Sequence, residues 1–240
     1  MGGGKTTMNN IRHLGVIMDG NRRWANNNGL QSFQGHDKGA EVFVSLCDWC
    51  GHANIDYLTV YAFSTENWKR SQLEVLHIFG LLDRFFKEKI GQCLENGIKI
   101  RVIGERSKFD KKTISIIEDA EAQTKDCNNL NVQIALSYGG RDEIIRGIKK
   151  LVEDILLNKQ AIDGISEDIF ASYLDTAGIP DVDLVIRTGG AENRRLSNFL
   201  PWQTVYSELY FSELLWPEFS KEEFEKALAY YQSVKRKLGK

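Results

Sequence analysis

Short apolar segments with the composition of buried strands alternate with longer helical segments, and this alternation limits the possible folds most strongly. Strands that alternate with helices form a mostly parallel sheet that is covered on both faces. The strands are expected at residues 14–18, 57–63, 98–103, 131–137 and 183–186, with a further apolar segment around Glu208. The helices are expected at residues 35–53, 72–95, 111–125, 141–157, 166–176 and 220–237. The sequence therefore predicts an α/β fold with a mostly parallel central sheet of about six strands, flanked by helices.

The length and composition of the chain agree with a single domain. Its 240 residues include 42% hydrophobic and 27% charged residues, which is enough to bury a core and keep a polar surface. The sequence contains no repeat and no interdomain linker. We therefore expect one domain over residues 11–240, preceded by a flexible N-terminal segment over residues 1–10 whose composition is compatible with a tag.

Charge and hydropathy argue against two classes of protein. The formal net charge is −2, whereas general nucleic-acid binders carry a basic surplus that displaces the counterions of phosphates. The sequence has no run of about 18 apolar residues, which a membrane-spanning helix would need. Its N-terminus also lacks the apolar core of a signal peptide. We therefore expect a cytoplasmic protein that binds no nucleic acid.

Cys47 and Cys50 have the CxxC spacing that occurs in redox and zinc sites. A zinc site would need two further ligands, and only His52 lies close in the sequence. The pair also lies within a mostly apolar stretch, residues 42–50, which has a helical pattern. We therefore expect a buried structural role for both cysteines.

Three polar and glycine-rich loops, residues 19–24, 64–70 and 187–197, follow expected strands. Ligands of open α/β sheets bind outside the carboxyl ends of the strands, so these loops are expected to form the functional site. In the first loop, exposed backbone N–H groups and two arginines suit a diphosphate. Asp19 beside such an anion is explained if Mg²⁺ bridges them. The alternative is a basic helix start that Asp19 caps, and this loop alone does not decide between the two.

The third loop carries a second group of cations beside glycines and a hydroxyl: Arg187, Arg194, Arg195 and Ser197. Because Arg187 directly follows a buried strand, a solvated surface loop is the weaker explanation. Two separate diphosphate sites in one domain predict an enzyme that joins two diphosphates. The expected helix at residues 72–95 has a wide apolar surface, which either lines a tunnel for a growing hydrocarbon or packs in the core.

Several motifs, in order along the chain, resemble those of the cis-prenyltransferases of the undecaprenyl diphosphate synthase type. They cover residues 13–25, 35–36, 61–70, 183–190 and 196–203, and the match continues at 206–211 and 215–217. The resemblance extends from about residue 12 to residue 239. The sequence lacks the DDxxD cluster of the all-helical, trans-type prenyl synthases, so the resemblance implies the α/β family.

The resemblance implies a magnesium-dependent enzyme that condenses isopentenyl diphosphate onto an allylic diphosphate primer. The primer is expected to be farnesyl diphosphate, and the product a long polyprenyl diphosphate such as undecaprenyl diphosphate. The resemblance also implies a homodimer with a hydrophobic tunnel. Such an enzyme would contact a membrane only transiently, to release its lipid product.

The resemblance further implies roles for single residues. Asp19 would hold Mg²⁺ and help the allylic leaving group depart, and Glu208 would supply a second carboxylate to the metal. Asn67 would lie near the proton lost after condensation, supported by Trp68 and Arg70. The allylic diphosphate site would comprise Gly20, Asn21, Arg22, Arg23, Trp24, His36, Ser64, Thr65 and Glu66. The isopentenyl diphosphate site would comprise Arg187, Arg195 and Ser197, and the tunnel wall would include Leu82 and Phe86.

The sequence departs from the family pattern at several places. Ser32 stands where the family commonly has arginine, which removes one cation from the allylic site and leaves the preferred primer open. The loop over residues 190–195 is two residues longer than usual, so either Arg194 or Arg195 could bind substrate; Arg195 is favoured because it directly precedes Leu196 and Ser197. Near the end, Lys237 replaces an arginine and loses its bidentate fork. Two alternatives stay open: a short-chain or irregular prenyl synthase on the same fold, and a non-catalytic partner subunit.

Overall fold

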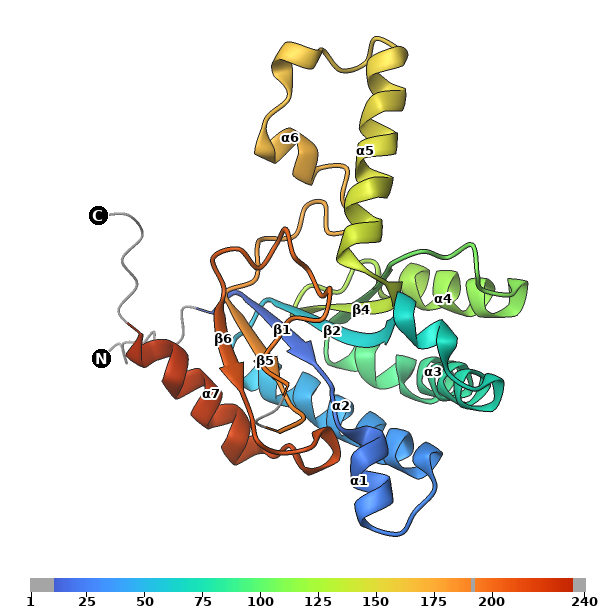
Figure 1. Cartoon of the computed structure of the whole chain (residues 1–240), viewed down its shortest axis with the longest axis vertical. Coiled ribbons are helices and arrows are strands. Elements are labelled where there is room, and N and C mark those ends of the chain that lie inside the picture. Colours follow the sequence, from blue (N-terminus) through green and yellow to red (C-terminus); the bar gives the residue numbers. More distant parts are fainter. Residues whose placement is uncertain (1–10, 191–192, 235–240) are drawn as a thin grey trace.

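Six parallel strands form the centre of the protein in a computed structural model that describes residues 11–190 and 193–234. The strands are β1 (His13–Ile17), β2 (Tyr57–Ser64), β3 (Ile98–Ile103), β4 (Leu130–Tyr138), β5 (Leu184–Arg187) and β6 (Glu208–Phe211). Their order in the sheet is β3-β4-β2-β1-β5-β6, and every neighbouring pair is parallel (Figure 1). The predicted α/β fold and its sheet of about six strands are confirmed, and the sheet is wholly parallel.

The helices also follow the predicted order. They are α1 (Asn21–Asn27), α2 (Ser32–His52), α3 (Gln72–Glu95), α4 (Lys111–Thr124), α5 (Gly140–Leu156), α6 (Glu167–Ala171) and α7 (Lys221–Ser233). Short 3₁₀ helices cover Thr65–Lys69, Ile162–Gly164 and Trp216–Glu218. Among the α-helices, α6 is shorter than the helix predicted at residues 166–176. The flexible segment expected at residues 1–10 and the substitution at Lys237 lie outside the described residues.

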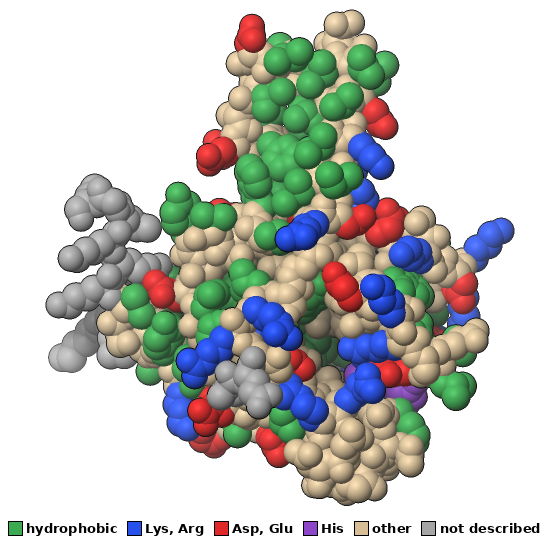
Figure 2. Space-filling model, viewed as in Figure 1, with side chains coloured by type: hydrophobic (Ala, Val, Ile, Leu, Met, Phe, Trp, Pro, Cys, Tyr) green, Lys and Arg blue, Asp and Glu red, His purple; other side chains and the backbone are tan. Residues whose placement is uncertain are grey.

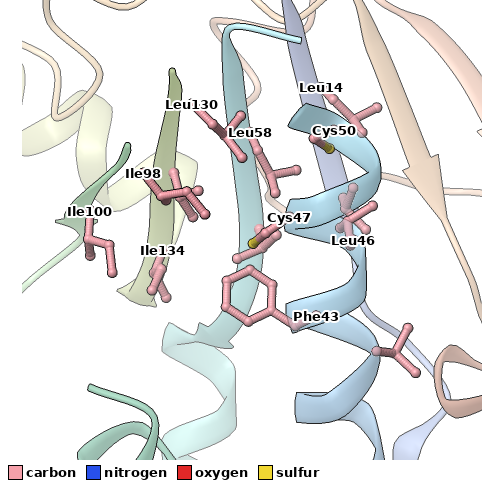
Figure 3. Packing of buried hydrophobic residues seen from close by; sticks show 14 of the residues in the cluster. Leu14, Phe43, Leu46, Cys47, Cys50, Leu58, Ile98, Ile100, Leu130 and Ile134 are labelled. Atoms are coloured by element: carbon pink, nitrogen blue, oxygen red, sulfur yellow. The ribbon is translucent and has the colours of Figure 1, made fainter. Parts of the chain in front are cut away.

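The two faces of the sheet are covered differently. On one face, α2, α3, α4 and α7 bury a large apolar cluster that includes Leu14 and Val16 of β1. Figure 3 shows Phe43 and Leu46 of α2 pointing toward the strands of this face. On the other face, Ile17 of β1 packs with Phe199 and other residues of the irregular segment after β5. Because successive side chains of a strand point to opposite faces, each strand contributes to both clusters.

Cys47 and Cys50 lie on the side of α2 that faces the sheet (Figure 3). Both are free and buried, and burial raises the pKa of each thiol, well above its ordinary value for Cys47. A thiol with a raised pKa is a poor nucleophile and a poor metal ligand. The predicted structural role of the CxxC pair is therefore confirmed.

The helix α5 rises away from the sheet, and α6 lies beside it, so that together they form an arm (Figure 1). Buried polar contacts fix the base of the arm: Arg146 donates to both oxygens of Asp175, at 2.7 Å each, and Tyr138 Oη donates to Glu143 at 2.6 Å. Beyond the base, the arm exposes an apolar surface: Ile145, Ile148, Val152, Leu156, Leu157, Ile162 and Ile165. Figure 2 shows hydrophobic side chains gathered over this arm, which exposes more apolar surface than a solvated helix needs.

None of the helices in the described part of the chain has the length and apolar composition required to cross a membrane.

Candidate active site

The polar loops at the carboxyl ends of the central strands surround a cavity of about 820 Å³. Most of the residues predicted for the functional site line it: Asp19, Gly20, Asn21, Arg22, Arg23, His36, Ser64, Glu66, Asn67, Arg70 and Ser197. The loops meet here because β1, β2 and β5 are adjacent and parallel, so their carboxyl ends lie at one edge of the sheet.

Asp19 lies at the centre of this arrangement, just after β1. Its Oδ1 accepts a hydrogen bond from Arg23 Nη2 at 3.2 Å, and its Oδ2 accepts one from Arg187 Nη2 at 2.9 Å. The residue that caps α1 is Gly20, and no side chain caps this helix. The alternative in which Asp19 serves as the helix cap is therefore wrong, and its carboxylate instead faces two guanidinium groups.

Arg187 connects Asp19 to the loop after β5. Its side chain is only 6% exposed, and its Nη1 donates to Ser197 Oγ at 2.7 Å and to the Arg195 carbonyl. Arg187 and Ser197 are thus brought together, as the prediction for the isopentenyl diphosphate site requires. Arg195 reaches this cluster through its backbone carbonyl. The side chains of both Arg194 and Arg195 are exposed, so the choice between them stays a prediction.

Gly189 allows Arg23 and Asp19 to approach the loop after β5. Its φ is +115°, and a Cβ atom there would lie 2.7 Å from Arg23 Nη2 and 2.9 Å from the Asp19 carboxylate. Only glycine combines this backbone conformation with such a close approach. The glycine pair at residues 189–190 therefore serves the geometry of the site.

Glu74 is a site residue that the sequence did not indicate. Three predicted site residues surround its carboxylate: Arg70, predicted to support Asn67, with Nη1 at 2.9 Å, and His36 and Arg22 of the predicted allylic site, with Nε2 at 3.4 Å and Nη1 at 3.8 Å. The carboxylate side chain is 12% exposed. Burial and the positive charge of Arg70 lower the pKa of His36 despite Glu74, so His36 is neutral at pH 7 and acts there as a hydrogen-bonding group.

Ser32 is the first residue of α2 and lies one turn before His36. Side chains four residues apart lie on the same side of a helix. An arginine at this position would therefore add a cation on the His36 side of the site. With serine at position 32 in place of arginine, Glu74 has Arg22, Arg70 and His36 as its partners.

The predicted loop after β2 forms the 3₁₀ helix Thr65–Lys69. Asn67 lines the cavity, and its Oδ1 accepts a hydrogen bond from Ser64 N at 3.0 Å, which orients the side chain. Trp68 lies behind the cavity wall, where it stacks on Phe79 and donates from Nε1 to Ser137 Oγ at 2.9 Å. Trp24 and Thr65, predicted to line the allylic site, do not border the cavity.

A smaller, largely apolar cavity of about 100 Å³ adjoins the polar one. The two cavities have Met18, Asn21, His36 and Ala62 in common. Leu82 of α3 lines the apolar cavity, as predicted for the tunnel wall. Phe86 does not: it is 4% exposed and packs toward α4, beside Ile116 and Ile117. The core-packing alternative therefore holds for Phe86, and Phe85 borders the cavity in its place.

Glu208 lies at the opposite end of the sheet from Asp19. It is the first residue of β6 and pairs with Leu184, which in turn pairs with Leu14. Asp19 lies five residues beyond Leu14, and a strand rises about 3.3 Å per residue, so Asp19 and Glu208 are offset by roughly 16 Å along the strand direction alone. Within one chain, Glu208 therefore lies too far from Asp19 for both carboxylates to hold the same metal ion, and its role as a metal ligand stays a prediction.

A family model described as putative undecaprenyl diphosphate synthase matches residues 17–239. The chain belongs to this family.

Members of the undecaprenyl diphosphate synthase family resemble the chain over nearly its whole length. An isoprenyl transferase of Clostridium perfringens is 43% identical over 95% of this chain and 89% of its own length. A tritrans,polycis-undecaprenyl-diphosphate synthase (geranylgeranyl-diphosphate specific) of Thermoplasma acidophilum is 45% identical, with the same coverage of 95% and 89%. The protein is therefore a prenyltransferase of the cis-prenyl diphosphate synthase type, as predicted.

The fold of the family is also seen in a solved structure. A lavandulyl diphosphate synthase from Lavandula x intermedia, in complex with dimethylallyl diphosphate, superimposes with a TM-score of 0.91. It is 28% identical and covers 96% of this chain and 98% of its own.

The close approach at Gly189 leads to a testable prediction. Gly189→Ala should displace the Arg23 and Asp19 side chains and strain a backbone with φ of +115°, so we expect a loss of activity and of about 1–3 kcal/mol in the free energy of unfolding. Gly80→Ala is the matched control, since nothing lies within 4 Å of a Cβ atom at that helical position. It should stabilise α3 by about 1 kcal/mol. Wild-type activity and stability in Gly189→Ala would contradict this account.

Proposed function

We propose that the protein carries out magnesium-dependent cis-prenyl chain elongation, adding isopentenyl diphosphate to farnesyl diphosphate to make a long polyprenyl diphosphate such as undecaprenyl diphosphate. The observation that carries the proposal is the position of Asp19, which is held between Arg23 and Arg187 at a polar cavity beside an apolar one. A polar site next to an apolar cavity suits substrates with a diphosphate head and a hydrocarbon tail.

The charged and hydrogen-bonding groups divide between the two proposed substrates. Arg22, Arg23 and His36 come from α1 and α2 and would hold the allylic diphosphate, together with the Gly20–Asn21 backbone. Arg187, the last residue of β5, and Ser197, in the loop after β5, would hold isopentenyl diphosphate. Asp19 lies between the two groups, because Arg23 and Arg187 each donate to one of its oxygens. Both diphosphates would therefore lie next to the same carboxylate.

The donor set at Asp19 fits magnesium, which is commonly held by one or two carboxylates together with phosphate oxygens. Bound Mg²⁺ would neutralise charge on the departing diphosphate. Asp19 is the residue that would hold it, and Glu208 of the same chain is too distant to share it. The arginines around Asp19 add positive charge where the leaving group develops negative charge.

In the proposed reaction, the C1–O bond of the allylic primer breaks and its diphosphate leaves. The terminal carbon of the isopentenyl double bond forms the new bond to that C1. A proton then leaves C2 of the isopentenyl unit, near Asn67, and would pass to an oxygen of the released diphosphate. The apolar cavity beside Leu82 and Phe85 would receive the tail of the primer. Burial of the reacting carbons excludes water, which would otherwise capture the cationic centre.

The chain also keeps the polar groups that a non-catalytic partner subunit could lose, including Asp19 and Asn67 at the cavity and Arg187 bonded to Asp19. A second candidate function is a short-chain or irregular prenyl synthase, and the similarity to the lavandulyl diphosphate synthase favours it. The primer could also be longer than farnesyl diphosphate, since a relative is named as specific for geranylgeranyl diphosphate.

A product assay separates these candidates. The protein is incubated with radiolabelled isopentenyl diphosphate, Mg²⁺ and dimethylallyl, farnesyl or geranylgeranyl diphosphate in turn, and the products are resolved by chain length. We expect long cis products from farnesyl diphosphate and none in excess chelator.

Asp19→Ala should lower kcat by at least about 100-fold, while titration calorimetry still detects binding of the primer. Asp56→Ala is the control, because Asp56 pairs with Arg12 at the amino end of β2. Full turnover by Asp19→Ala would overturn the proposal.

The apolar cavity predicts how product length responds to mutation. Leu82→Ala removes part of the cavity wall and enlarges the cavity. Because a larger cavity holds a longer hydrocarbon tail, we expect longer products than those of the wild type. Phe86→Leu is the matched control on the same helix, since Phe86 packs toward α4 and should leave product length unchanged. Equal product distributions for Leu82→Ala and the wild type would exclude this cavity as the tail site.

We also propose that the arm forms the interface of a homodimer. Its exposed apolar side chains include Ile145 at 53% and Leu156 at 75% exposure, and apolar patches of this kind mark protein interfaces. The double variant Ile145→Lys/Leu156→Lys should sediment as a monomer at a concentration where the wild type is a dimer. Leu94→Lys, at an exposed apolar position of α3, should stay dimeric. A dimeric double variant would place the interface elsewhere.

A further inference from the structure

Asn198 connects the loop after β5 to the loop after β2 and to the start of α5. Its Oδ1 accepts a hydrogen bond from the Arg141 backbone N–H at 2.9 Å, and its Nδ2 donates to Glu66 Oε1 at 3.3 Å. Its backbone carbonyl accepts a hydrogen bond from Gly140 N at 2.8 Å. The side chain also lines the cavity. One residue of the loop after β5 thus contacts both the loop after β2 and the start of α5.

The backbone conformation directs the Asn198 side chain to this position. Ser197 has a φ of +50° and Asn198 a φ of +66°, two consecutive residues in the left-handed region. Asparagine tolerates this region better than most side chains. The N-cap residue of α5 is Gly139, which has no side chain, so Asn198 supplies from a distant loop the acceptor that a cap residue would normally supply.

The orientation of the Asn198 amide follows from its two partners. Arg141 N–H can only donate, so the atom that it contacts must be the oxygen of the amide. Burial alone would raise the pKa of Glu66, but hydrogen bonds from its own backbone, Ser64 and Asn198 lower it below its ordinary value. Glu66 is therefore an ionised acceptor at neutral pH, and it requires the NH₂ group of Asn198. Both contacts select the same orientation of the side chain.

We propose that Asn198 is a positioning residue that holds the two substrate loops in register, with Ser197 and Arg187 on one side and Glu66 and Asn67 on the other. This inference rests on the proposed function, because it assigns each loop to one substrate. Ser197 accepts from Arg187 Nη1 at 2.7 Å, and Asn67 follows Glu66 directly in the chain. A shift between these loops of about 1 Å would misalign the reacting carbons and could slow the reaction by about 100-fold.

Two variants remove the Asn198 contacts in different ways. Asn198→Gly removes the side chain but keeps a residue that adopts positive φ and keeps the carbonyl bonded to Gly140. Asn198→Asp keeps an acceptor for the Arg141 N–H but places a second carboxylate against Glu66. In the double variant Asn198→Asp/Glu66→Gln, the amide introduced at position 66 can donate to the carboxylate introduced at position 198, so the contact returns with donor and acceptor exchanged. Asn129→Asp is the control, because Asn129 bonds the Asn96 carbonyl near the amino ends of the strands.

Steady-state kinetics distinguish a positioning role from a structural one. We expect kcat to fall between about 10- and 100-fold in Asn198→Asp and Asn198→Gly, with each KM within about threefold of the wild type. The effect of Asn198→Asp is then measured twice, in the wild type and in Glu66→Gln. The kcat of the double variant relative to Glu66→Gln should be at least about tenfold higher than the kcat of Asn198→Asp relative to the wild type. Asn129→Asp should match the wild type. Normal kcat in both Asn198 variants, or no recovery in the double variant, would overturn the inference.

Hydrogen exchange measured on the same variants makes the test independent of turnover. If Asn198 couples the loops, Asn198→Gly should speed amide exchange both in the first turn of α5 and in Thr65–Lys69. Faster exchange in α5 alone would show that Asn198 only caps that helix and would contradict the inference. A wild-type protein with no prenyl transfer would refute the proposed function, while the exchange data would still decide whether Asn198 couples the loops.

Discussion

The arrangement of the active site depends on the Asp19 carboxylate, which is held between two guanidinium groups from opposite sides. Arg23 reaches it from α1, and Arg187 reaches it from the end of β5 with a side chain that is almost fully buried. A buried arginine requires an anionic partner, and the Asp19 carboxylate accepts a hydrogen bond from each of the two arginines. The same three groups therefore hold the loops after β1 and β5 together and present charge to a ligand.

The parallel sheet makes this arrangement possible. Because β1, β2 and β5 are neighbours and run in one direction, the loops that follow them meet at one edge. Close approaches at Gly189 to Asp19, and at Gly39 to the Asn21 side chain, pack these loops and helices tightly together. Asn198 then bonds the loop after β5 to the loop after β2, so that the groups assigned to each substrate form one continuous wall.

Much of this could be predicted from the sequence, because strand periodicity and the polar loops after each strand are local features. Five of the six strands and the long helices were expected close to their observed bounds. Contacts that depend on packing could not be predicted. Glu74 enters the site only because α3 packs against α2, and a helix with a wide apolar surface does not reveal whether Phe85 or Phe86 faces the cavity. The distance between Glu208 and Asp19 within one chain could not be predicted either, because the register of a four-residue strand is not visible in the sequence. The apolar periodicity of α5 is also typical of a helix that packs in the core, and only the structure shows that this face of α5 is exposed.

The carboxylate of Glu74 has a consequence for which anions can occupy the allylic site. Arg70, His36 and Arg22 already contact the Glu74 carboxylate in the free protein, so an anionic ligand must compete with Glu74 for these groups. A singly charged anion offers these groups no more than Glu74 does, whereas a diphosphate brings several negative charges and more acceptor oxygens. A ligand that displaces Glu74 from these three groups would therefore need more negative charge than one carboxylate carries, which favours multiply charged head groups over small, singly charged anions.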